Sequence, residues 1–402
     1  MDQTPKKRIL FVDDEAPVLN LLQTLFRHAN PECESSFADR GAKALALLQT
    51  QSYDVIISDM RMPEMTGAEL LEQVRDRYPR TIRVVLSGYA DQPMSVRSLA
   101  SAHQHLAKPF TLTGLQNTLG RIFEATRHVP DPDLQSALGA LHVLPSTLPT
   151  HARVTRDFAS PAATTDAVGS LLARDIAATA KLLQIVHSAF FGAPRPLLTA
   201  KDASHALGVN LLRTLTVANQ LLIPPPDGAE VGGLPLESLI HHGMNTGLIA
   251  TRILAQEHAA TETIKLAFTA GVLHQVGRLA LATVRPKQYA EVMRLATTGE
   301  ATLLQAEEDA FGIRHPQAGA YLLGLWGLPQ QLVELVAHTL QPGPLRGRGF
   351  GAVSALHVAS YLTRSTNALP DSATPPLDPD YLAALRVGPE RIAAWSKIVP
   401  TP

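Results

Sequence analysis

The feature that most constrains the fold is a regular alternation of short apolar segments with helical patterns over the first 127 residues. The apolar segments are rich in β-branched residues, as buried strands are. We predict strands at Arg8–Val12, Glu34–Ala38, Val55–Ser58, Arg83–Leu86 and His103–Leu106, with helical patterns near 16–29, 40–50, 67–77, 91–100 and 112–126. Because strands that alternate with helices form a parallel sheet covered on both faces, the sequence predicts an α/β, doubly wound (βα)5 domain.

After about residue 128 the strand-like pattern stops, and helical segments follow one another between Gly- and Pro-rich breaks. The expected helices cover about 173–192, 201–222, 236–259, 263–282, 287–297, 301–311, 314–326 and 329–340, with closing helices beyond them. We therefore predict a multidomain chain. Its parts would be an α/β domain at 1–127, a linker at 128–145, an all-α domain at 146–340 and a C-terminal helical extension at 341–402.

Composition and charge argue against several classes of protein. The 402 residues are 45% hydrophobic and 18% charged, as in globular domains, and no apolar stretch is long enough to span a bilayer. The single cysteine, Cys33, rules out a disulfide framework, and the first residues lack a signal-peptide pattern. We therefore expect a cytoplasmic protein without a membrane partner. Acidic and basic residues balance in both halves of the chain, which disfavours direct nucleic-acid binding.

Polar residues collect where the predicted strands end. Asp13 and Asp14 follow the first strand, and Asp59, Ser87 and Lys108 follow the third, fourth and fifth. Parallel sheets of this kind bind ligands at the carboxyl ends of their strands, so folding would bring these side chains to one rim. The plainer alternative is a solvated rim with ordinary loop acids, which fits any one of these residues better than all five together.

The chemistry of this set points to phosphoryl transfer. Three neighbouring carboxylates repel one another unless a hard cation joins them, and Mg²⁺ prefers such oxygen ligands. Asp59 would then be the nucleophile that forms an aspartyl phosphate. Lys108 would neutralise the phosphoryl oxygens, and Ser87 would donate a hydrogen bond to them.

The segments LFVDDE, SDMRMPEMTG, LSGYAD and LAKPF resemble the receiver domain of two-component response regulators, over roughly residues 6–126. The resemblance implies a flavodoxin-like fold and phosphorylation of Asp59 by a histidine kinase. It also implies Mg²⁺ ligation by Asp14 and Asp59, with help from Asp13 and the main-chain carbonyl of Arg61.

The same resemblance implies a switch. In the family, the hydroxyl at the position of Ser87 moves toward the phosphoryl group, and an aromatic side chain three residues before the lysine follows it inward. The residue at that position is His105. A histidine ring could follow the hydroxyl and add pH sensitivity, but the residues alone favour a surface histidine without this role.

The helical region is rich in histidine but poor in the carboxylates that a di-metal hydrolase needs. His274 lies on an apolar helical segment, and Gln275 stands where a His-Asp metal pair would have its aspartate. No aspartate occurs between residues 241 and 308, and the glutamates of that stretch do not flank His274 in the sequence. A neutral amide is a poor ligand for two divalent cations, so we interpret His274 as a core histidine.

The order of segments nevertheless resembles the HDOD domain, a variant of the His-Asp superfamily. The segments that carry the resemblance are HHGMNTGLIATRI, AFTAGVLHQVGRLAL and EEDAFGIRHPQAGAYLLGLWGLP, with helices upstream that plain His-Asp hydrolases lack. Members of the family generally lack the metal ligands, so His241, His274 and Gln275 would form a degenerate site without metal, and no cofactor is expected there. One departure is His187, where the family usually has asparagine.

The favoured function is a phosphorylation-dependent response regulator whose non-catalytic output binds another protein. Its partners would be a histidine kinase, an unidentified output protein and, in one version of the switch, a second copy of the chain. One alternative is a cyclic di-GMP phosphodiesterase of the HD-GYP type, against which Gln275 and the missing Gly-Tyr-Pro loop argue. The other is a DNA-binding regulator with a turn at Gly208, but Arg213 is the sole basic side chain in the segment after that turn.

Overall fold

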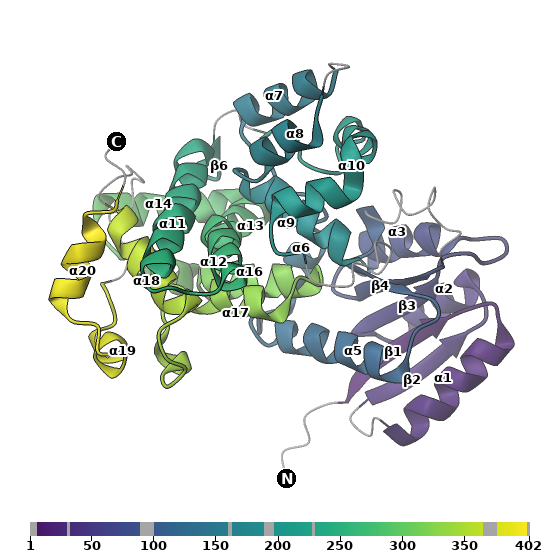
Figure 1. Ribbon diagram of the computed structural model, residues 1–402. Helices are drawn as coiled ribbons and strands as arrows, with labels where there is room; N and C mark the ends of the chain where they lie inside the picture. Colours follow the sequence, from purple (N-terminus) through teal and green to yellow (C-terminus); the bar gives the residue numbers. More distant parts are fainter. Residues whose placement is uncertain are drawn as a thin grey trace, which may run out of the picture.

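A computed structural model describes residues 6–29, 33–88, 100–159, 163–188, 197–226, 230–364 and 376–399. An α/β unit at the N-terminal end packs against a larger helical unit (Figure 1). Within the described part of the chain, no helix is long and apolar enough to cross a membrane.

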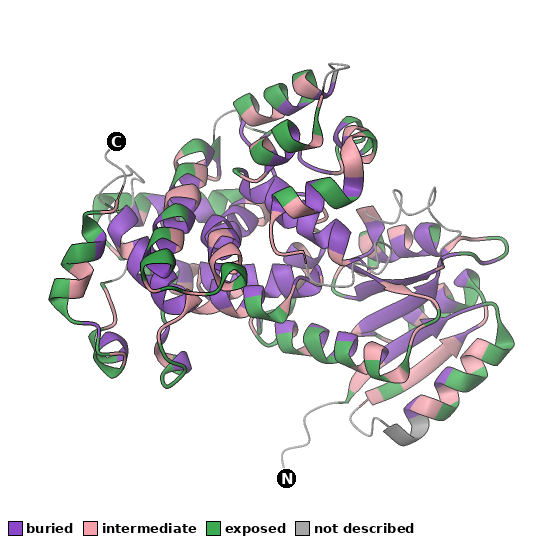
Figure 2. Cartoon of the chain, in the orientation of Figure 1, coloured by how far each residue is buried: buried purple, intermediate pink, exposed green. Residues whose placement is uncertain are grey.

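The N-terminal unit is the predicted doubly wound sheet. Five parallel strands lie in the order β2-β1-β3-β4-β5, namely β1 (Lys7–Val12), β2 (Cys33–Ala38), β3 (Val55–Asp59), β4 (Ile82–Ser87) and β5 (Gln104–Ala107). The helices described around it are α1 (Ala16–Ala29), α2 (Gly41–Thr50), α3 (Gly67–Arg77) and α5 (Leu112–Thr126). Apolar side chains of α1 and α5 pack on one face of the sheet, and those of α2 and α3 on the other. The central strands are accordingly buried on both faces (Figure 2). The helix predicted near 91–100 lies outside the described residues except at its end.

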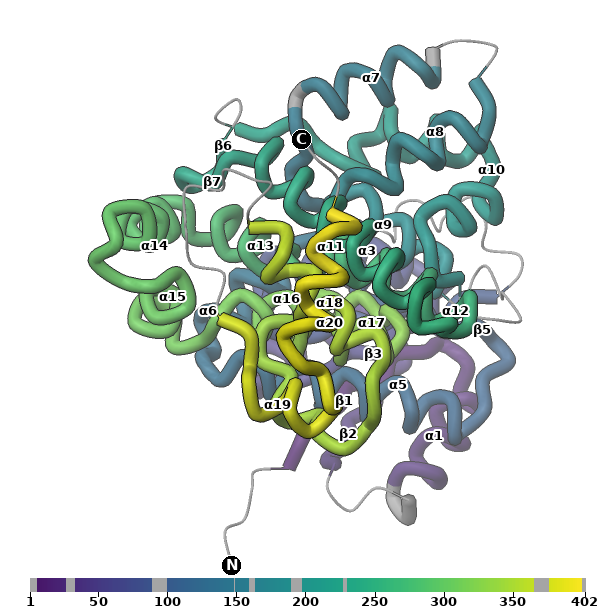
Figure 3. Tube along the Cα trace, turned by 60° about the vertical axis from the view of Figure 1, so that its left-hand side comes forward, coloured from purple at the N-terminus to yellow at the C-terminus, as the bar shows by residue number. Residues whose placement is uncertain are grey.

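The rest of the chain is helical, as predicted. Its helices are α6 (Pro132–Gly139), α7 (Leu148–Ala159), α8 (Thr165–Leu172), α9 (Ile176–His187), α10 (Ala200–Val217), α11 (Leu236–Gln256), α12 (Thr261–Leu273), α13 (Val276–Val284), α14 (Pro286–Thr298), α15 (Leu303–Phe311), α16 (His315–Leu325), α17 (Gln330–His338), α18 (Ala352–Thr363), α19 (Pro379–Ala384) and α20 (Pro389–Ser396). A short 3-10 turn, η2 (Gly343–Leu345), follows α17. The closing helices return to α11, where Arg391 of α20 forms an ion pair with Glu257 (Figure 3).

Three local features differ from the sequence-based expectation. A small hairpin of β6 (Glu230–Val231) and β7 (Leu234–Pro235) forms where a loop was expected, because Gly232 and Gly233 adopt the positive φ angles, 56° and 71°, that a tight turn requires. The expected helix 201–222 ends at Val217 and is kinked at Gly208, where φ is 74°. The expected helix 263–282 is two helices, α12 and α13, which are separated by His274 and Gln275.

The two units share a continuous apolar core on the side of α5. Helix α5 packs on α16 so closely that a Cβ on Gly324 would lie 2.6 Å from the Cβ of Ala125. Helix α6, which lies within the expected linker, is also anchored to the sheet. The main-chain oxygen of Gly139 at its end accepts hydrogen bonds from the buried side chains of Arg83 (2.9 Å) and His103 (2.8 Å). The helical unit is therefore held against the β4-β5-α5 side of the sheet.

Candidate functional site

Three of the residues expected at the strand ends lie together. Asp13 after β1 is 1% exposed and Asp59 at the end of β3 is 8% exposed. Lys108 after β5 places its Nζ 2.8 Å from Oδ2 of Asp13 and also forms an ion pair with Asp59. Asp14 is exposed beside them. The carboxyl ends of the strands thus carry a pair of carboxylates that share one ammonium group.

The environment of Asp59 is mixed. Burial raises the pKa of Asp59, while the hydrogen bond and charge of Lys108 act in the opposite direction. The main-chain N–H of Arg61 donates to Oδ2 of Asp59 at 2.8 Å and fixes the carboxylate. The pKa of Lys108 is raised because its contacts with Asp13 and Asp59 outweigh its partial burial. A desolvated carboxylate next to a permanent cation is an arrangement suited to a nucleophile that receives an anionic group.

The loop after Asp59 is held by one close backbone approach. The N–H of Gly67 donates to the main-chain oxygen of Met60 at 2.9 Å, and a Cβ on Gly67 would lie 2.0 Å from the main-chain oxygen of Asp59. Helix α3 begins there with a capping box, in which Thr66 and Glu69 satisfy each other's main-chain N–H groups. Only glycine allows the helix to start this close to β3.

Ser87 ends β4 and lies opposite Ala107 of β5 in the parallel register. Its side chain is 3% exposed, and its Oγ has no hydrogen-bond partner among the described residues. A buried hydroxyl without a partner costs free energy, so this group is available to a ligand or to a rearranged loop.

The carboxylates at the strand ends determine whether Mg²⁺ could bind there. The described residues contain no group of three or more His, Cys, Asp or Glu side chains arranged to hold a metal. At the strand ends, the ammonium of Lys108 pairs with both Asp13 and Asp59. Mg²⁺ commonly takes only one or two protein carboxylates and completes its shell with water and phosphoryl oxygens. The two buried carboxylates and the exposed Asp14 therefore fit this ion.

His105 is not a surface residue, so the expectation of a surface histidine is wrong. It is 8% exposed in β5, where it lines the boundary with the helical unit. Burial and the charge of Lys181 lower its pKa to about 3. The ring is neutral at ordinary pH, so it does not act as a pH sensor there.

The histidines of the helical unit form a buried cluster, but with a different membership from the one predicted. His242 of α11 is 3% exposed, and its ring centroid lies 5.2 Å from that of His274. His241 is exposed on the other side of α11, so the prediction that it belongs to the degenerate site is wrong. Adjacent residues on a helix point about 100° apart, so only one of the pair can face the core.

The side chains of His274 and Gln275 are hydrogen-bonded to each other, whereas Oε1 of Gln275 has no partner among the described residues. The Nδ1 of His274 donates to the main-chain oxygen of Gly271 (2.6 Å), which leaves its Nε2 to accept from the amide of Gln275 at 2.9 Å. Burial lowers the pKa of His274 to about 3. Just beyond, Gly277 lets α13 cross α16, because a Cβ there would lie 1.8 Å from the main-chain oxygen of His315.

A buried carboxylate that the sequence analysis dismissed completes this cluster. Glu307 is fully buried and accepts from both the main-chain N–H (2.9 Å) and Nδ1 (2.8 Å) of His315. Its other oxygen accepts from Tyr289, whose hydroxyl accepts in turn from Arg278 (both 3.0 Å). Burial alone would raise the pKa of Glu307, but the charge and hydrogen bonds of His315 bring it below its usual value. The cluster is a buried polar network in which Oε1 of Gln275 and Nε2 of His315 have no hydrogen-bond partner among the described residues.

Two glutamines link the units, and no sequence pattern pointed to them. The amide of Gln104 in β5 donates to the main-chain oxygen of Gly324 in α16 at 3.0 Å. The amide of Gln184 in α9 donates to the main-chain oxygen of His103 at 3.1 Å. Because β5 is an edge strand, the output helices cover an edge that would otherwise be open.

The segment considered for DNA binding has its turn but not its basic surface. Gly208 breaks α10, as the sequence suggested. The side chain of Arg213, however, donates to the main-chain oxygen of Phe158 at 2.9 Å. This hydrogen bond within the fold uses one of the donors that Arg213 would need to contact a DNA phosphate.

Comparison with known proteins matches both units. A response regulator receiver domain model matches residues 9–120, and an HDOD domain model matches residues 144–342. The chain is 33% identical to the hydrogenase transcriptional regulatory protein HoxA of Cupriavidus necator over 154 residues, which are 38% of this chain and 30% of that protein. It is 35% identical to the regulatory protein AtoC of Escherichia coli over 122 residues, 30% of this chain and 26% of that protein. The matches therefore span less than a third of either relative.

Solved structures that resemble the chain include the MmoQ response regulator of Methylococcus capsulatus, with 26% identity over 63% of this chain and 98% of that one and a TM-score of 0.49. An HDOD domain protein of Geobacter sulfurreducens is 21% identical over 70% of this chain and 89% of that one, with a TM-score of 0.35. With a receiver domain over the parallel sheet and an HDOD domain over the helices, this chain belongs to the response regulators of two-component systems.

Proposed function

We propose that this chain is a response regulator phosphorylated on Asp59 by a histidine kinase, and that its HDOD domain acts by binding another protein rather than by catalysis. The observation that carries the proposal is the buried Asp59 beside Lys108, at the end of the sheet whose β5 edge the output helices cover.

In the phosphorylation step, a carboxylate oxygen of Asp59 attacks the phosphorus of a phosphohistidine. The new P–O bond replaces the P–N bond, and the histidine leaves as imidazole after it gains a proton. Lys108 would balance the charge on the transferred group, and Ser87 would donate its unused hydroxyl to a phosphoryl oxygen. Asp13, Asp14, Asp59 and the main-chain carbonyl of Arg61 would hold Mg²⁺, which lowers the charge repulsion that the acceptor and the phosphoryl group present to each other.

Transmission to the output would run through β4 and β5. A phosphoryl group adds roughly 1.5 to 2 negative charges at the end of β3. If Ser87 turns toward it, the space behind β4 changes. His105, which packs at the domain boundary two residues before Ala107, the partner of Ser87 in β5, would respond. A full switch needs about 5 kcal/mol of preference for the active arrangement. The switch would then either alter the contacts between the two domains or form a homodimer through the β4-β5 side of the receiver.

Protein binding fits the HDOD domain better than hydrolysis does. The described residues contain no group of three or more His, Cys, Asp or Glu side chains that could hold a metal, and Gln275 stands where the catalytic aspartate would be, with its amide bonded to His274. Metal analysis of the purified protein tests this point. Two tightly bound transition metals per chain would contradict a non-catalytic output.

The test of the acceptor is phosphorylation by acetyl phosphate in the presence of Mg²⁺, followed by intact-mass measurement. Asp59→Asn should abolish the modification. The matched control is Asp54→Asn, at the opposite end of β3, where Asp54 pairs with Lys7 and accepts from the N–H of Arg8. Modification of the Asp59→Asn protein at another residue would refute the assignment.

The test of the output compares partners and dynamics of Asp59→Asn with those of the wild-type protein held active by beryllofluoride. Hydrogen exchange should change in peptides that cover β5, α9 and α16. Affinity capture should then recover a partner in only one of the two states. Identical exchange and identical partners in both states would contradict a phosphorylation-controlled output.

A further inference from the structure

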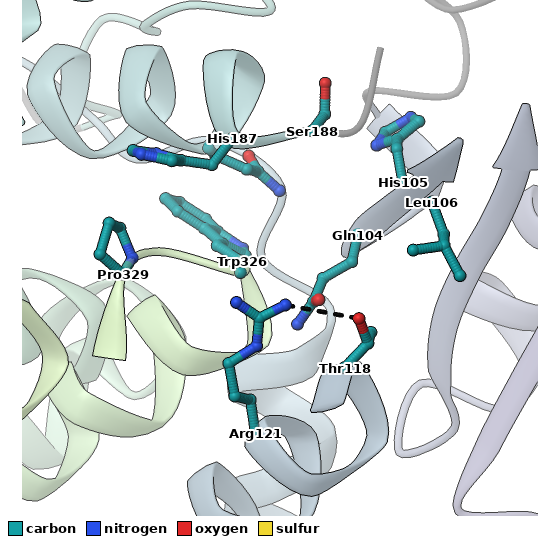
Figure 4. A pocket seen from close by; sticks show the side chains of 11 residues that line it. Gln104, His105, Leu106, Thr118, Arg121, His187, Ser188, Trp326 and Pro329 are labelled. Carbon is teal, nitrogen blue, oxygen red and sulfur yellow. Dashed lines mark hydrogen bonds between the residues drawn. The ribbon is translucent and has the colours of Figure 1, made fainter. Parts of the chain in front are cut away.

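A cavity of about 280 Å³ lies between the two domains (Figure 4). Gln104, Thr118 and Arg121 line it from the receiver side, and Gln184, His187 and Trp326 from the HDOD side. In Figure 4, Trp326 lies between His187 and Arg121. Both domains are therefore needed to form this space.

Three buried polar atoms on the HDOD side have no hydrogen-bond partner among the described residues. They are Oε1 of Gln184, Nε2 of His187 and Nε1 of Trp326. Gln184 is only 4% exposed and Trp326 only 2%. Each unpaired buried polar group costs about 1–3 kcal/mol, so three around one cavity indicate a polar occupant.

The hydrogen bonds that these residues already make fix the roles of the unpaired atoms. The Nδ1 of His187 donates to the main-chain oxygen of Leu183 at 2.8 Å, which leaves Nε2 as an acceptor on the neutral ring. The amide nitrogen of Gln184 is used on His103, so its Oε1 is a free acceptor. The indole N–H of Trp326 can only donate. The occupant must therefore offer both an acceptor and at least one donor.

The charged side chain at the cavity indicates what kind of molecule could bind there. Arg121 is exposed at the rim and makes one long hydrogen bond, 3.4 Å, to Thr118. No acidic residue is among the described residues that line the cavity. A planar guanidinium without an opposing acid favours a carboxylate.

We propose that this cavity is a binding site for a small organic acid that also carries a hydroxyl or amino group. The carboxylate accepts from Arg121 and from the indole N–H of Trp326. The hydroxyl or amino group donates to Gln184 or His187. Because the two walls belong to different domains, the ligand stabilises their docked arrangement by mass action.

The experiment uses the full chain labelled with ¹⁵N in its two tryptophans, titrated with malate and, separately, with succinate, which lacks the hydroxyl group. Trp326 lines the cavity, whereas Trp395 packs against Phe350 elsewhere and serves as an internal control. Malate should shift the indole N–H signal of Trp326 and leave that of Trp395 unchanged. Succinate should need about a tenfold higher concentration, the cost of one unmade hydrogen bond. The Trp326→Phe variant assigns the two signals.

The variant that tests the proposal is Arg121→Gln, which should weaken malate binding at least about tenfold. Its matched control is Arg127→Gln, an exposed arginine after the same helix that pairs only locally with Glu124 and should bind malate normally. The proposal is wrong if neither acid shifts Trp326, since the cavity then holds water. It is equally wrong if both tryptophans shift alike, if succinate binds as well as malate, or if Arg121→Gln binds as well as the wild type.

Discussion

The side-chain amide of Gln184 in the HDOD domain donates a hydrogen bond to the main-chain oxygen of His103, at the entry to the edge strand of the receiver sheet. The two residues are far apart in the sequence, and the 3.1 Å contact joins the HDOD domain to β5, which is separated from β3 and Asp59 by β4. The receiver's β5 is thus part of the domain interface.

Gln184→Leu should weaken that interface. The carbonyl of His103 would lose its partner, at a cost of about 1 kcal/mol, while the volume of the side chain is nearly kept. Hydrogen exchange measured by mass spectrometry should quicken in peptides that cover residues 104–107. Gln305→Leu, which removes an exposed contact to Asp309 within α15, should leave this exchange unchanged. Equal exchange in the two variants would mean that Gln184 does not hold β5.

Gly67→Ala should destabilise the receiver by about 1–3 kcal/mol or more, because its Cβ has no room beside the main-chain oxygen of Asp59. Phosphorylation by acetyl phosphate should slow as well, because the added Cβ would displace the main chain at Asp59, the proposed acceptor. Gly120→Ala on α5, where a Cβ would meet nothing within 4 Å, should stabilise by about 0.5–1 kcal/mol. Urea unfolding of both variants measures the difference. Similar stability of the two variants would contradict the close approach.

Glu307→Gln should cost about 3 kcal/mol, because it removes the charge that His315 and Arg278 face inside the core. A lowered carboxylate pKa gives stability that is present above the unfolded pKa and is lost as the pH falls through the folded pKa. In urea unfolding, the difference in stability between wild type and variant should therefore stay constant near neutral pH and narrow as the pH falls below about 5, close to the pKa of an unfolded glutamate. Glu308→Gln, which breaks a half-exposed pair with Arg314, should cost less than about 1 kcal/mol.

Lys181 should make stability depend on pH in the alkaline range. Burial lowers its pKa to about 7 from the ordinary 10.5, so the unfolded chain binds more protons between these values. Stability then rises with pH by up to about 1.4 kcal/mol per unit across that window, because the penalty for the buried charge is progressively relieved. Lys181→Met should remove this slope, and the exposed Lys201→Met should retain it. Parallel curves for wild type and Lys181→Met would contradict a neutralised lysine.

The sequence predicted the parallel sheet well because five apolar segments of strand length stand between clear helical patterns. It also placed Asp13, Asp59 and Lys108 together, since the carboxyl ends of parallel strands share one rim. The break between α12 and α13 could not be seen, because the residues around His274 are apolar and helix-forming.

Tertiary contacts decide the remaining features. The choice between His241 and His242 depends on how α11 is rotated against the core, which periodicity near a helix start does not fix. Glu307 was dismissed because it is distant from His274 in the sequence, although the fold brings His315 between them. The cavity between the domains depends on polar residues that belong to no motif, such as Gln104 and Gln184.

Helix α13 crosses α16 at Gly277, directly after His274 and Gln275. A histidine, a helix break and a glycine in this order look like the remains of a catalytic motif. Here each of them has an architectural role, because His274 caps α12, Gln275 holds the imidazole, and Gly277 lets two backbones touch. The packing of the core therefore accounts by itself for a histidine, a helix break and a glycine in this order.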